Sequence, residues 1–261
     1  MLQHLPSCLP WPYSRDRLQQ IEKCSVAVVE VMYSKDVRKT VGYPVRHKTI
    51  IKRIEEPDAM ALALSFLRSG HVIVVPTDTV YGLAADGLNP EAVERLYIIK
   101  ARPRSQPIPV LLADIEDVWF VIRSLPAPAH RLARAFWPGP LTLVLPARPE
   151  LPAVLRGGRD TVGVRIPNHE WLRALIRRLR RPLAATSANL SGQPPALTAD
   201  EVTAQIDERV PLILDAGPAP GGQPSTVVDC TGPAPVILRP GPISEEDIRR
   251  VWEESTTEDG Q

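Results

Sequence analysis

Short apolar runs alternate with helix-like segments from residue 49 to residue 252, and this alternation limits the possible folds more than any other feature of the chain. Strand-like runs fall at residues 71–75, 110–113, 141–145, 161–166, 183–186, 212–214, 226–229 and 236–238. Helical periodicity falls at residues 59–68, 91–100, 114–124, 127–137, 170–180 and 244–252. Parallel neighbours need long crossovers, and the last strands follow one another too closely for that. The pattern therefore predicts one α/β domain with a twisted, mixed parallel and antiparallel sheet and flanking helices.

The chain divides into three parts by composition. Residues 1–48 carry scattered prolines and a single strand-like run at 26–32, without a period that would bury one face. This composition favours an N-terminal extension with partial disorder. Residues 49–253 form the predicted α/β domain, and residues 254–261 form a C-terminal tail.

Composition narrows the class of protein. No apolar run approaches the roughly 18 residues of a membrane span, and the N-terminus lacks the basic start and apolar core of a secretory signal. The three cysteines, Cys8, Cys24 and Cys230, are too few and too scattered for a disulfide framework or a zinc site. We therefore expect a cytoplasmic protein without membrane contact.

Charge is distributed unevenly, although the net charge is only +1. Residues 1–53 hold 10 Lys and Arg against 4 Asp and Glu, which leaves 21 against 26 for the rest. The main body is therefore slightly acidic, and broad nucleic-acid binding by it is disfavoured. A module that binds double-stranded RNA or tRNA without catalysis nevertheless remains the alternative hypothesis.

The strand at 71–75 leads directly into Pro76–Leu83, a segment dense in hydroxyl groups. Open α/β sheets often hold ligands beyond the carboxyl ends of their strands, which is where this segment would place Thr77, Asp78 and Thr79. A polar turn with no ligand explains the same residues equally well. The segment alone therefore leaves both interpretations open.

Other groups suited to phosphate binding also lie at the ends of elements. Lys100 and Arg102 close the helix at 91–100, although two cations there also complement a helix C-terminus. Ser187 and Asn189 follow the strand at 183–186, where a simple Ser or Asx turn is the alternative.

Two further arginines, Arg165 and Arg239, end the strands at 161–166 and 236–238. Single arginines at strand ends are usually surface charges, and only their occurrence together with the other groups favours a site. The sequence has no phosphate loop, dinucleotide fingerprint or nucleophile elbow, so the common nucleotide folds and acyl-enzyme chemistry lose support.

Seven blocks in order make the chain resemble the YrdC-type threonylcarbamoyl-AMP synthase family from about Thr49 to Arg250. The blocks are Pro76–Leu83, Lys100–Arg102, Trp137–Leu143, Val162–Asn168, Ser187–Gly192, Ser225–Asp229 and Leu238–Gly241. The Lys-x-Arg and Ser-x-Asn tripeptides are the signature of the family, which has a large concave site on its mixed sheet.

The resemblance implies an L-threonylcarbamoyladenylate synthase, a nucleotidyltransferase that uses L-threonine, bicarbonate and ATP and releases pyrophosphate. Mg²⁺ accompanies ATP in this expectation, and no metal ligand from protein side chains is expected. The product passes to a tRNA threonylcarbamoyl transferase complex, which modifies the adenosine next to the anticodon. A weak direct contact with tRNA is compatible with this role.

The resemblance also implies site residues. Those matching threonine contacts are Thr79, Arg165, Ala185 and Ser225. Those matching ATP contacts are Lys100, Arg102, Gln106, Thr161, Ser187, Asn189 and Arg239, with Lys100 and Arg102 as the catalytic pair. An arginine fork suits carboxylate or phosphate, and adenylation needs positioning and charge neutralisation more than a nucleophile.

Two positions depart from the family pattern. Leu111 stands where some members carry a histidine near threonine, and Pro195 stands where some carry a serine that contacts ATP. The chain also resembles the short form, without the extra C-terminal domain. A related carbamoyl-adenylate activity in hydrogenase maturation is a third hypothesis, disfavoured because the scattered cysteines do not supply the zinc-binding segments of such proteins.

Overall fold

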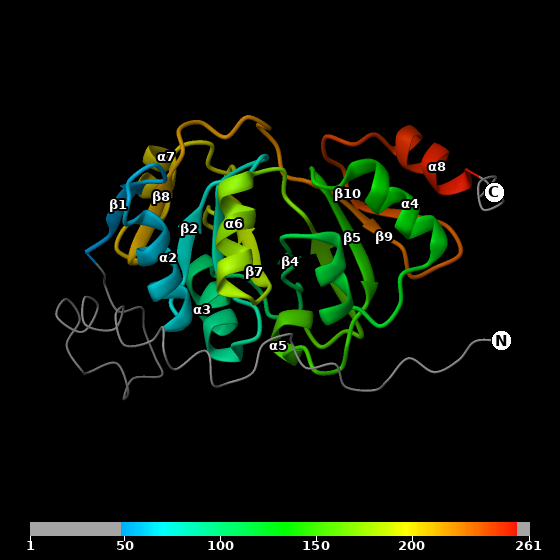
Figure 1. The fold of residues 1–261 in the computed structure, drawn as a ribbon, viewed down its shortest axis with the longest axis horizontal. Helices are drawn as coiled ribbons and strands as arrows, with labels where there is room; N and C mark the ends of the chain where they lie inside the picture. The colour runs from blue at the N-terminus through cyan, green and yellow to red at the C-terminus, as the bar shows by residue number, and fades with distance from the viewer. Residues whose placement is uncertain (1–47, 255–261) are drawn as a thin grey trace. The chain divides into compact units, whose positions relative to one another are not determined.

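A single ten-stranded sheet runs through the described part of the chain (Figure 1). The computed structural model describes residues 48–254, so the strand-like run at 26–32 and nearly all of the predicted extension and tail lie outside the described residues. The strands are β1 (Ile50–Arg53), β2 (Ile73–Val75), β3 (Gly82–Asp86), β4 (Val110–Leu111), β5 (Leu141–Pro146), β6 (Thr161–Arg165), β7 (Leu183–Ser187), β8 (Leu212–Asp215), β9 (Thr226–Asp229) and β10 (Val236–Arg239).

The helices lie between these strands in the chain, except for α8, which follows the last strand. They are α2 (Ala59–Arg68), α3 (Pro90–Lys100), α4 (Ala127–Phe136), α5 (Ala153–Arg156), α6 (Glu170–Leu179), α7 (Ala199–Ile206), α8 (Glu245–Glu253) and the 3-10 helix η3 (Ile115–Phe120). None of them, within residues 48–254, is long and apolar enough to cross a membrane.

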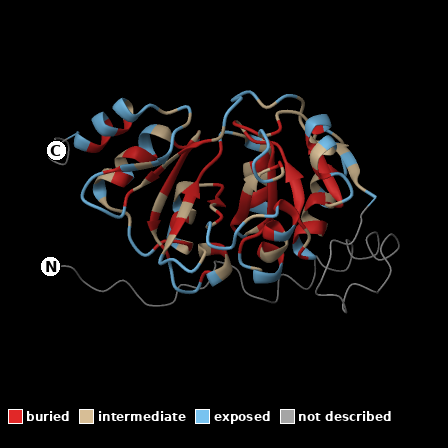
Figure 2. Ribbon diagram, turned by 180° about the vertical axis from the view of Figure 1, so that it is seen from behind, coloured by how far each residue is buried: buried red, intermediate tan, exposed pale blue. Residues whose placement is uncertain are grey.

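The strand order is β1-β8-β2-β3-β7-β4-β6-β5-β9-β10. Four neighbouring pairs are parallel, namely β1 with β8, β2 with β8, β4 with β6 and β5 with β9, and the other pairs are antiparallel. The predicted mixed α/β sheet is therefore confirmed. Figure 2 shows most of the strands as buried elements, with helices whose outer faces are exposed.

Four elements were not predicted, and one was predicted with the wrong geometry. The elements β1, β3, α5 and α7 escaped the sequence analysis. β3 consists of Gly-Leu-Ala-Ala-Asp, residues with low β propensity, and it is a strand because it pairs with β2 and β7 on either side. The segment 114–124 contains a six-residue 3-10 helix rather than a long α-helix.

Local signals define α3, which carries two of the predicted site residues. Asn89 caps its start by accepting hydrogen bonds from the backbone N–H groups of the first turn, and proline follows at the first helical position. Ala101, in the left-handed region with φ 51°, ends the helix. The N–H of Arg102 then bonds to the carbonyl of Tyr97, which closes the helix end. Lys100 and Arg102 are thereby fixed on either side of this stop.

The connection between β8 and β9 crosses most of the sheet with few residues. Six strands lie between these two in the sheet, yet only residues 216–225 join them. Seven strand spacings measure roughly 34 Å along a flat sheet, and a fully extended chain of this length reaches about 36–40 Å. We call residues 216–225 the crossover segment. It runs along one edge of the sheet in Figure 1, in gold to orange, and it contains bends at Gly217 and Pro218 and a turn at Pro220 and Gly221, so the curved sheet brings its ends closer together than a flat sheet would.

Candidate active site

Strand pairing directs the predicted polar residues to one face of the sheet. Leu143 of β5 pairs with Val164 of β6, and both are buried in the main hydrophobic cluster. Their neighbours Thr142 and Arg165 therefore point to the opposite face, because side chains alternate along a strand. We call this the site face.

One further strand, β7, adds side chains to the site face. On β7, Ala184 pairs with Val110 in the same cluster, which turns Ala185 and Ser187 toward the site face. The predicted contacts Ala185, Ser187 and Arg165 thus share one face through strand register alone.

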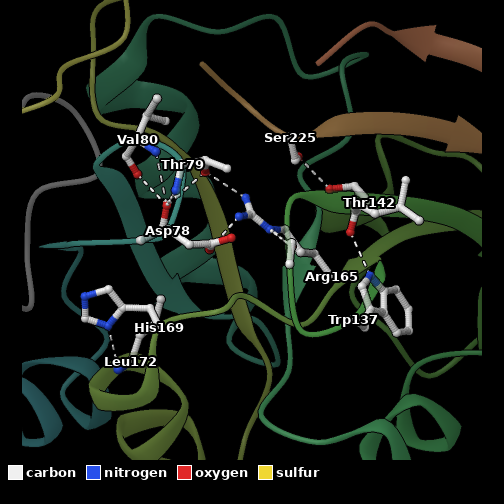
Figure 3. Close-up of polar contacts among 12 residues, drawn as sticks. Asp78, Thr79, Val80, Trp137, Thr142, Arg165, His169, Leu172 and Ser225 are labelled. Atoms are coloured by element: carbon white, nitrogen blue, oxygen red, sulfur yellow. Dashed lines mark hydrogen bonds and ion pairs between the residues drawn. The ribbon is translucent and has the colours of Figure 1, made fainter. Parts of the chain in front are cut away.

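Arg165 lies at the centre of the site face and is buried, with 6% of its surface exposed. Its Nε donates to the carbonyl of Gly139 at 2.9 Å, and its Nη1 donates to Thr79 Oγ1 at 2.9 Å. Its Nη2 donates to Asp78 Oδ1 at 2.6 Å and forms an ion pair with it. Figure 3 shows the guanidinium between the Asp78–Thr79 turn and the side chains of Thr142 and Ser225. Arg165 therefore joins two segments predicted to bind threonine.

The turn between β2 and β3 is held by its own hydroxyl groups. Thr77 Oγ1 accepts the N–H groups of Thr79 and Val80 and donates to the Val80 carbonyl at 2.7 Å. Thr77 thus shapes the turn, while Thr79, 1% exposed, presents its hydroxyl to Arg165. The segment is a polar turn built by Thr77, and the role of Thr79 in binding a ligand stays a prediction.

The crossover segment packs directly on this turn. The Tyr81 hydroxyl donates to the carbonyl of Gly217 at 2.7 Å and accepts the N–H of Ala216 at 3.1 Å. Burial raises the pKa of Tyr81 to about 12, so the hydroxyl keeps its proton. A Cβ on Gly221 would lie 2.6 Å from the Asp78 carbonyl oxygen and 2.7 Å from Thr79 Cα. Only glycine permits this approach without a shift of the backbone.

Lys100 is enclosed by the Ser-x-Asn segment. Its Nζ lies 2.7 Å from the carbonyl and 3.1 Å from the hydroxyl of Ser187. It also lies 3.0 Å from the carbonyl and 2.8 Å from Oδ1 of Asn189. An ammonium has three N–H groups, so these four oxygens occupy all of them. Lys100 positions Ser187 and Asn189 in this structure, and its predicted contact with ATP stays a prediction.

The charge of Lys100 has no carboxylate partner among residues 48–254. Burial, with repulsion from Arg102, lowers the pKa of Lys100 to about 8. The group is therefore still mainly protonated at pH 7. A buried ammonium held only by neutral oxygens leaves a positive potential at this end of the site face.

Arg102 and Arg239 are also free of ion pairs within the described chain. Arg102 donates to the carbonyls of Gln106 and Pro107, each at 3.2 Å. Arg239 donates to the carbonyl of Ser225 at 2.8 Å and 3.1 Å and to its hydroxyl at 3.0 Å. Desolvation lowers the pKa of Arg239, and repulsion from Arg165 and then Arg102 lowers it further. Arginines from three distant segments thus act on one another at the site.

Ser225 connects the two ends of the site. Its hydroxyl is 2.8 Å from that of Thr142 and receives a hydrogen bond from Arg239. A Cβ on Gly241 would lie 2.4 Å from the Thr226 nitrogen, so the segment after β10 also lies against this position. Ser225 is predicted to bind threonine and Arg239 to bind ATP, and the contact between them brings the two predicted regions together.

Three predicted residues take less direct positions. Ala185 is buried in the middle of β7, with 7% of its surface exposed. Thr161 is half-buried at the start of β6. Gln106 is exposed, and its carbonyl accepts from Arg102 and from the Tyr97 hydroxyl. Their assignments to threonine and ATP stay predictions.

Three residues beside Arg165 were given no binding role by the sequence analysis. Gly139, in the block Trp137–Leu143, accepts from Arg165 and donates its N–H to the Ile166 carbonyl at 2.8 Å. Asp78 lay in the first motif without an assigned role. Leu111 pairs with Arg165 in register on β4, so an apolar side chain adjoins the guanidinium where some family members carry histidine.

His169 caps α6 and also faces the site. Its Nδ1 accepts the N–H of Leu172 at 3.3 Å, which leaves the ring proton of the neutral form on Nε2 (Figure 3). Burial lowers the pKa of His169, while the nearby Asp78 carboxylate opposes that shift. His169 is therefore neutral at pH 7, and its hydrogen bond to Leu172 gives it a structural role at the start of α6.

The donor set of the site does not suit a resident metal ion. Among residues 48–254 there is no group of three or more carboxylate, imidazole or thiol side chains that would hold one. Asp78, the carboxylate nearest the predicted phosphate groups, already neutralises Arg165. We therefore derive no step from a metal held by the protein, and Mg²⁺ bound with ATP stays a prediction.

Known proteins resemble this chain over most of its length. A threonylcarbamoyl-AMP synthase of Pyrococcus abyssi is 42% identical over 200 residues, which cover 77% of this chain and 58% of the relative. That of Bacillus subtilis is 42% identical over 193 residues, covering 74% and 56%. A putative threonylcarbamoyl-AMP synthase of Mycobacterium tuberculosis is 41% identical, covering 72% and 87%. The chain thus spans little more than half the length of the first two relatives.

Solved structures agree with the fold. The P. abyssi Sua5 protein complexed with L-threonine superposes with a TM-score of 0.75 at 41% identity, covering 78% of this chain and 61% of that one. The Escherichia coli YciO protein gives a TM-score of 0.65 at 29% identity, covering 74% and 94%. The family model for Sua5, YciO and YrdC, described as telomere recombination, matches residues 65–241. The chain belongs to the Sua5/YciO/YrdC family, as the resemblance implied.

Proposed function

We propose that this protein is an L-threonylcarbamoyladenylate synthase, an enzyme of the nucleotidyltransferase class. It joins L-threonine and bicarbonate as a carbamate, with release of water, and transfers AMP from ATP to that carbamate, with release of pyrophosphate. The relatives that carry this name and the threonine complex of the P. abyssi protein support the proposal.

The observation that carries the proposal is the separation of charge along the site face. At one end Arg165 and Asp78 form a neutral, buried pair. At the other, Lys100, Arg102 and Arg239 lack a carboxylate partner within residues 48–254. Burial, and then repulsion from the neighbouring arginines, lowers the pKa of Lys100 and of Arg239. A neutral region beside a cationic one suits an amino acid placed next to a polyphosphate.

This arrangement accounts for catalysis without a protein nucleophile. The carbamate oxygen attacks the α-phosphate, the bond from that phosphorus to the bridging oxygen breaks, and pyrophosphate leaves. Arg102 and Arg239 stabilise negative charge on the phosphates, and Arg165 with Thr79 holds the amino acid in place. Positioning and charge stabilisation of this kind supply most of the rate in phosphoryl and nucleotidyl transfer.

The remaining roles follow from this reaction. Mg²⁺ enters with ATP and stays on its phosphates. The product passes to a separate transferase complex that modifies the adenosine next to the anticodon of tRNA. Direct contact with tRNA is weak, since the body of the chain is slightly acidic outside residues 1–53. The cytoplasm is the proposed compartment.

An omission assay tests the proposal. The protein is incubated with ATP, bicarbonate and L-threonine, each substrate is left out in turn, and the threonylcarbamoyl adduct of AMP is measured by mass spectrometry. We expect the adduct, with equimolar pyrophosphate, only in the complete mixture. Pyrophosphate release that does not depend on threonine would refute the proposal, and salt-sensitive RNA binding without turnover would favour the RNA-binding alternative.

A further inference from the structure

Arg165 keeps a defined part of its hydrogen-bonding capacity for a ligand. A guanidinium carries five N–H groups, and Gly139, Thr79 and Asp78 each take one. One N–H on each terminal nitrogen has no acceptor among the described residues. Each of these two N–H groups can donate to an oxygen of a bound carboxylate. The contacts within the chain therefore leave Arg165 with unused donors for a substrate while Asp78 stays in place.

Asp78 has a corresponding unused oxygen. Its Oδ1 accepts from Arg165, and no residue in the described part of the chain donates to its Oδ2. The carboxylate is largely buried, with 10% side-chain exposure against 7% for Arg165. An uncompensated charge at such a depth is costly, so each half of the pair neutralises the other before any ligand arrives.

Charge balance then restricts what this pair accepts. A carboxylate that binds to Arg165 brings a second negative charge beside Asp78, so that these three groups carry a net charge of −1. Arg239 acts by charge on Arg165, but Asp78 is not among the charges that act on Arg239. His169, the other titratable group next to Asp78, does not offset this net charge, because burial lowers the pKa of His169 and keeps the ring neutral at pH 7. An α-amino acid brings an ammonium together with its carboxylate and restores neutrality.

We propose that Asp78 binds the α-ammonium of the amino-acid substrate through Oδ2 while Arg165 binds its α-carboxylate. This assignment rests on the proposed function, in which that substrate is L-threonine. The turn at Thr77 and the contact with Gly221 fix the backbone of Asp78, so the carboxylate is oriented in advance. Asp78 is thus a specificity-determining residue that selects a zwitterion over a simple hydroxy acid.

The test compares two ligands that differ only at the amino group. Calorimetry measures the binding of L-threonine and of its analogue with a hydroxyl in place of the α-amino group, 2,3-dihydroxybutanoate of matching configuration. We expect the wild-type protein to bind threonine at least about tenfold more tightly than the analogue. Asp78→Asn should reduce this preference to about threefold or less, because the amide has no charge to pair with the ammonium.

The matched control is Asp86→Asn. Asp86 is also a largely buried aspartate paired with an arginine, Arg181 at 2.7 Å, but it lies at the other end of β3. This variant should keep the wild-type preference. Asp78→Glu, a second variant at the site, should keep a preference for threonine even with altered affinity, which covers the case in which Asp78→Asn fails to fold.

The outcomes separate the two proposals. Equal weakening of both ligands by Asp78→Asn would mean that Asp78 only supports Arg165, and an unchanged preference would mean that it does not contact the ammonium. Either result overturns the assignment, even with threonine-dependent product in the omission assay. A wild-type protein that binds threonine and makes no product would refute the proposed function alone, and one that does not bind threonine would refute both proposals.

Discussion

Lys100→Met tests whether the buried ammonium is held as the structure implies. Methionine keeps an unbranched side chain of similar length and removes the charge and all N–H groups. Ser187 O also accepts the N–H of Asn189, so it retains a donor. Asn189 O and Asn189 Oδ1 have Lys100 as their only donor within residues 48–254. The substitution thus leaves two buried acceptors without a partner.

Two opposing free-energy contributions determine how much Lys100→Met changes the stability of the fold. Two buried acceptors that lose their donor cost roughly 2–6 kcal/mol together. The wild-type protein in turn bears the cost of burying the ammonium. Its pKa falls from 10.5 to about 8, which corresponds to about 3 kcal/mol at neutral pH. We expect Lys100→Met to lower the free energy of unfolding by about 1–2 kcal/mol at pH 7.

The pH dependence is the sharper result. The folded-state pKa of Lys100 lies below its unfolded value, so above pH 8 the unfolded chain binds the proton more strongly than the folded protein. The wild-type protein therefore gains stability relative to the variant as pH rises from about 8 toward 10.5. Between pH 8 and pH 10 the difference should grow by about 2–3 kcal/mol.

Urea unfolding at fixed ionic strength, followed by circular dichroism from pH 7 to pH 10, measures this difference. Lys52→Met is the matched control, since its hydrogen bonds and ion pairs with Glu56 and Asp58 raise the pKa of Lys52. Its contribution is fully present below pH 10.5, so that difference should stay flat in the same window. A flat difference for Lys100→Met as well would refute the account of a desolvated ammonium.

The other predictions concern the two ends of the site. Gly221→Ala should raise the KM for threonine at least about fivefold and lower the free energy of unfolding by about 1–3 kcal/mol, because the new Cβ would meet the backbone at Thr79. Gly232→Ala, whose Cβ would have its nearest atom at 3.8 Å, should change neither quantity. Steady-state kinetics and urea unfolding measure both variants, and equal behaviour of the two would contradict the close approach. Arg239→Ala should raise the KM for ATP at least about tenfold, because it removes a charged donor from the proposed phosphate site. Arg249→Ala, on the exposed face of α8, should leave the KM for ATP unchanged. An unchanged KM for ATP in Arg239→Ala would show that this arginine does not bind the phosphates.

Local signals in the sequence were sufficient for the elements that carry the signature residues. Asn89 and proline mark the start of α3, so Lys100 and Arg102 were predicted in the same turn, as the structure has them. β3 was not predicted, because its Gly, Ala and Asp residues have no local preference for a strand and pair only in the presence of β2 and β7.

The contacts between distant segments of the site could not be predicted from the sequence. Asp78 and Arg165 are 87 residues apart, and Lys100 and Asn189 are 89 apart. The sequence indicates that each side chain suits phosphate or carboxylate, but the sheet order decides which charges neutralise one another. The resemblance predicted Arg165 as a threonine contact, whereas its buried partner Asp78 became visible only through the fold.

The crossover segment touches both ends of the site. Its first residues are held by the Tyr81 hydroxyl, and its last residue, Ser225, is held by Thr142 and Arg239. Between them, Gly221 lies so close to the backbone of Asp78 and Thr79 that no Cβ would fit there. One short segment therefore contacts the turn that carries Asp78 and Thr79 and also the serine beside Arg239, so the residues at the two ends of the site depend on the same stretch of backbone.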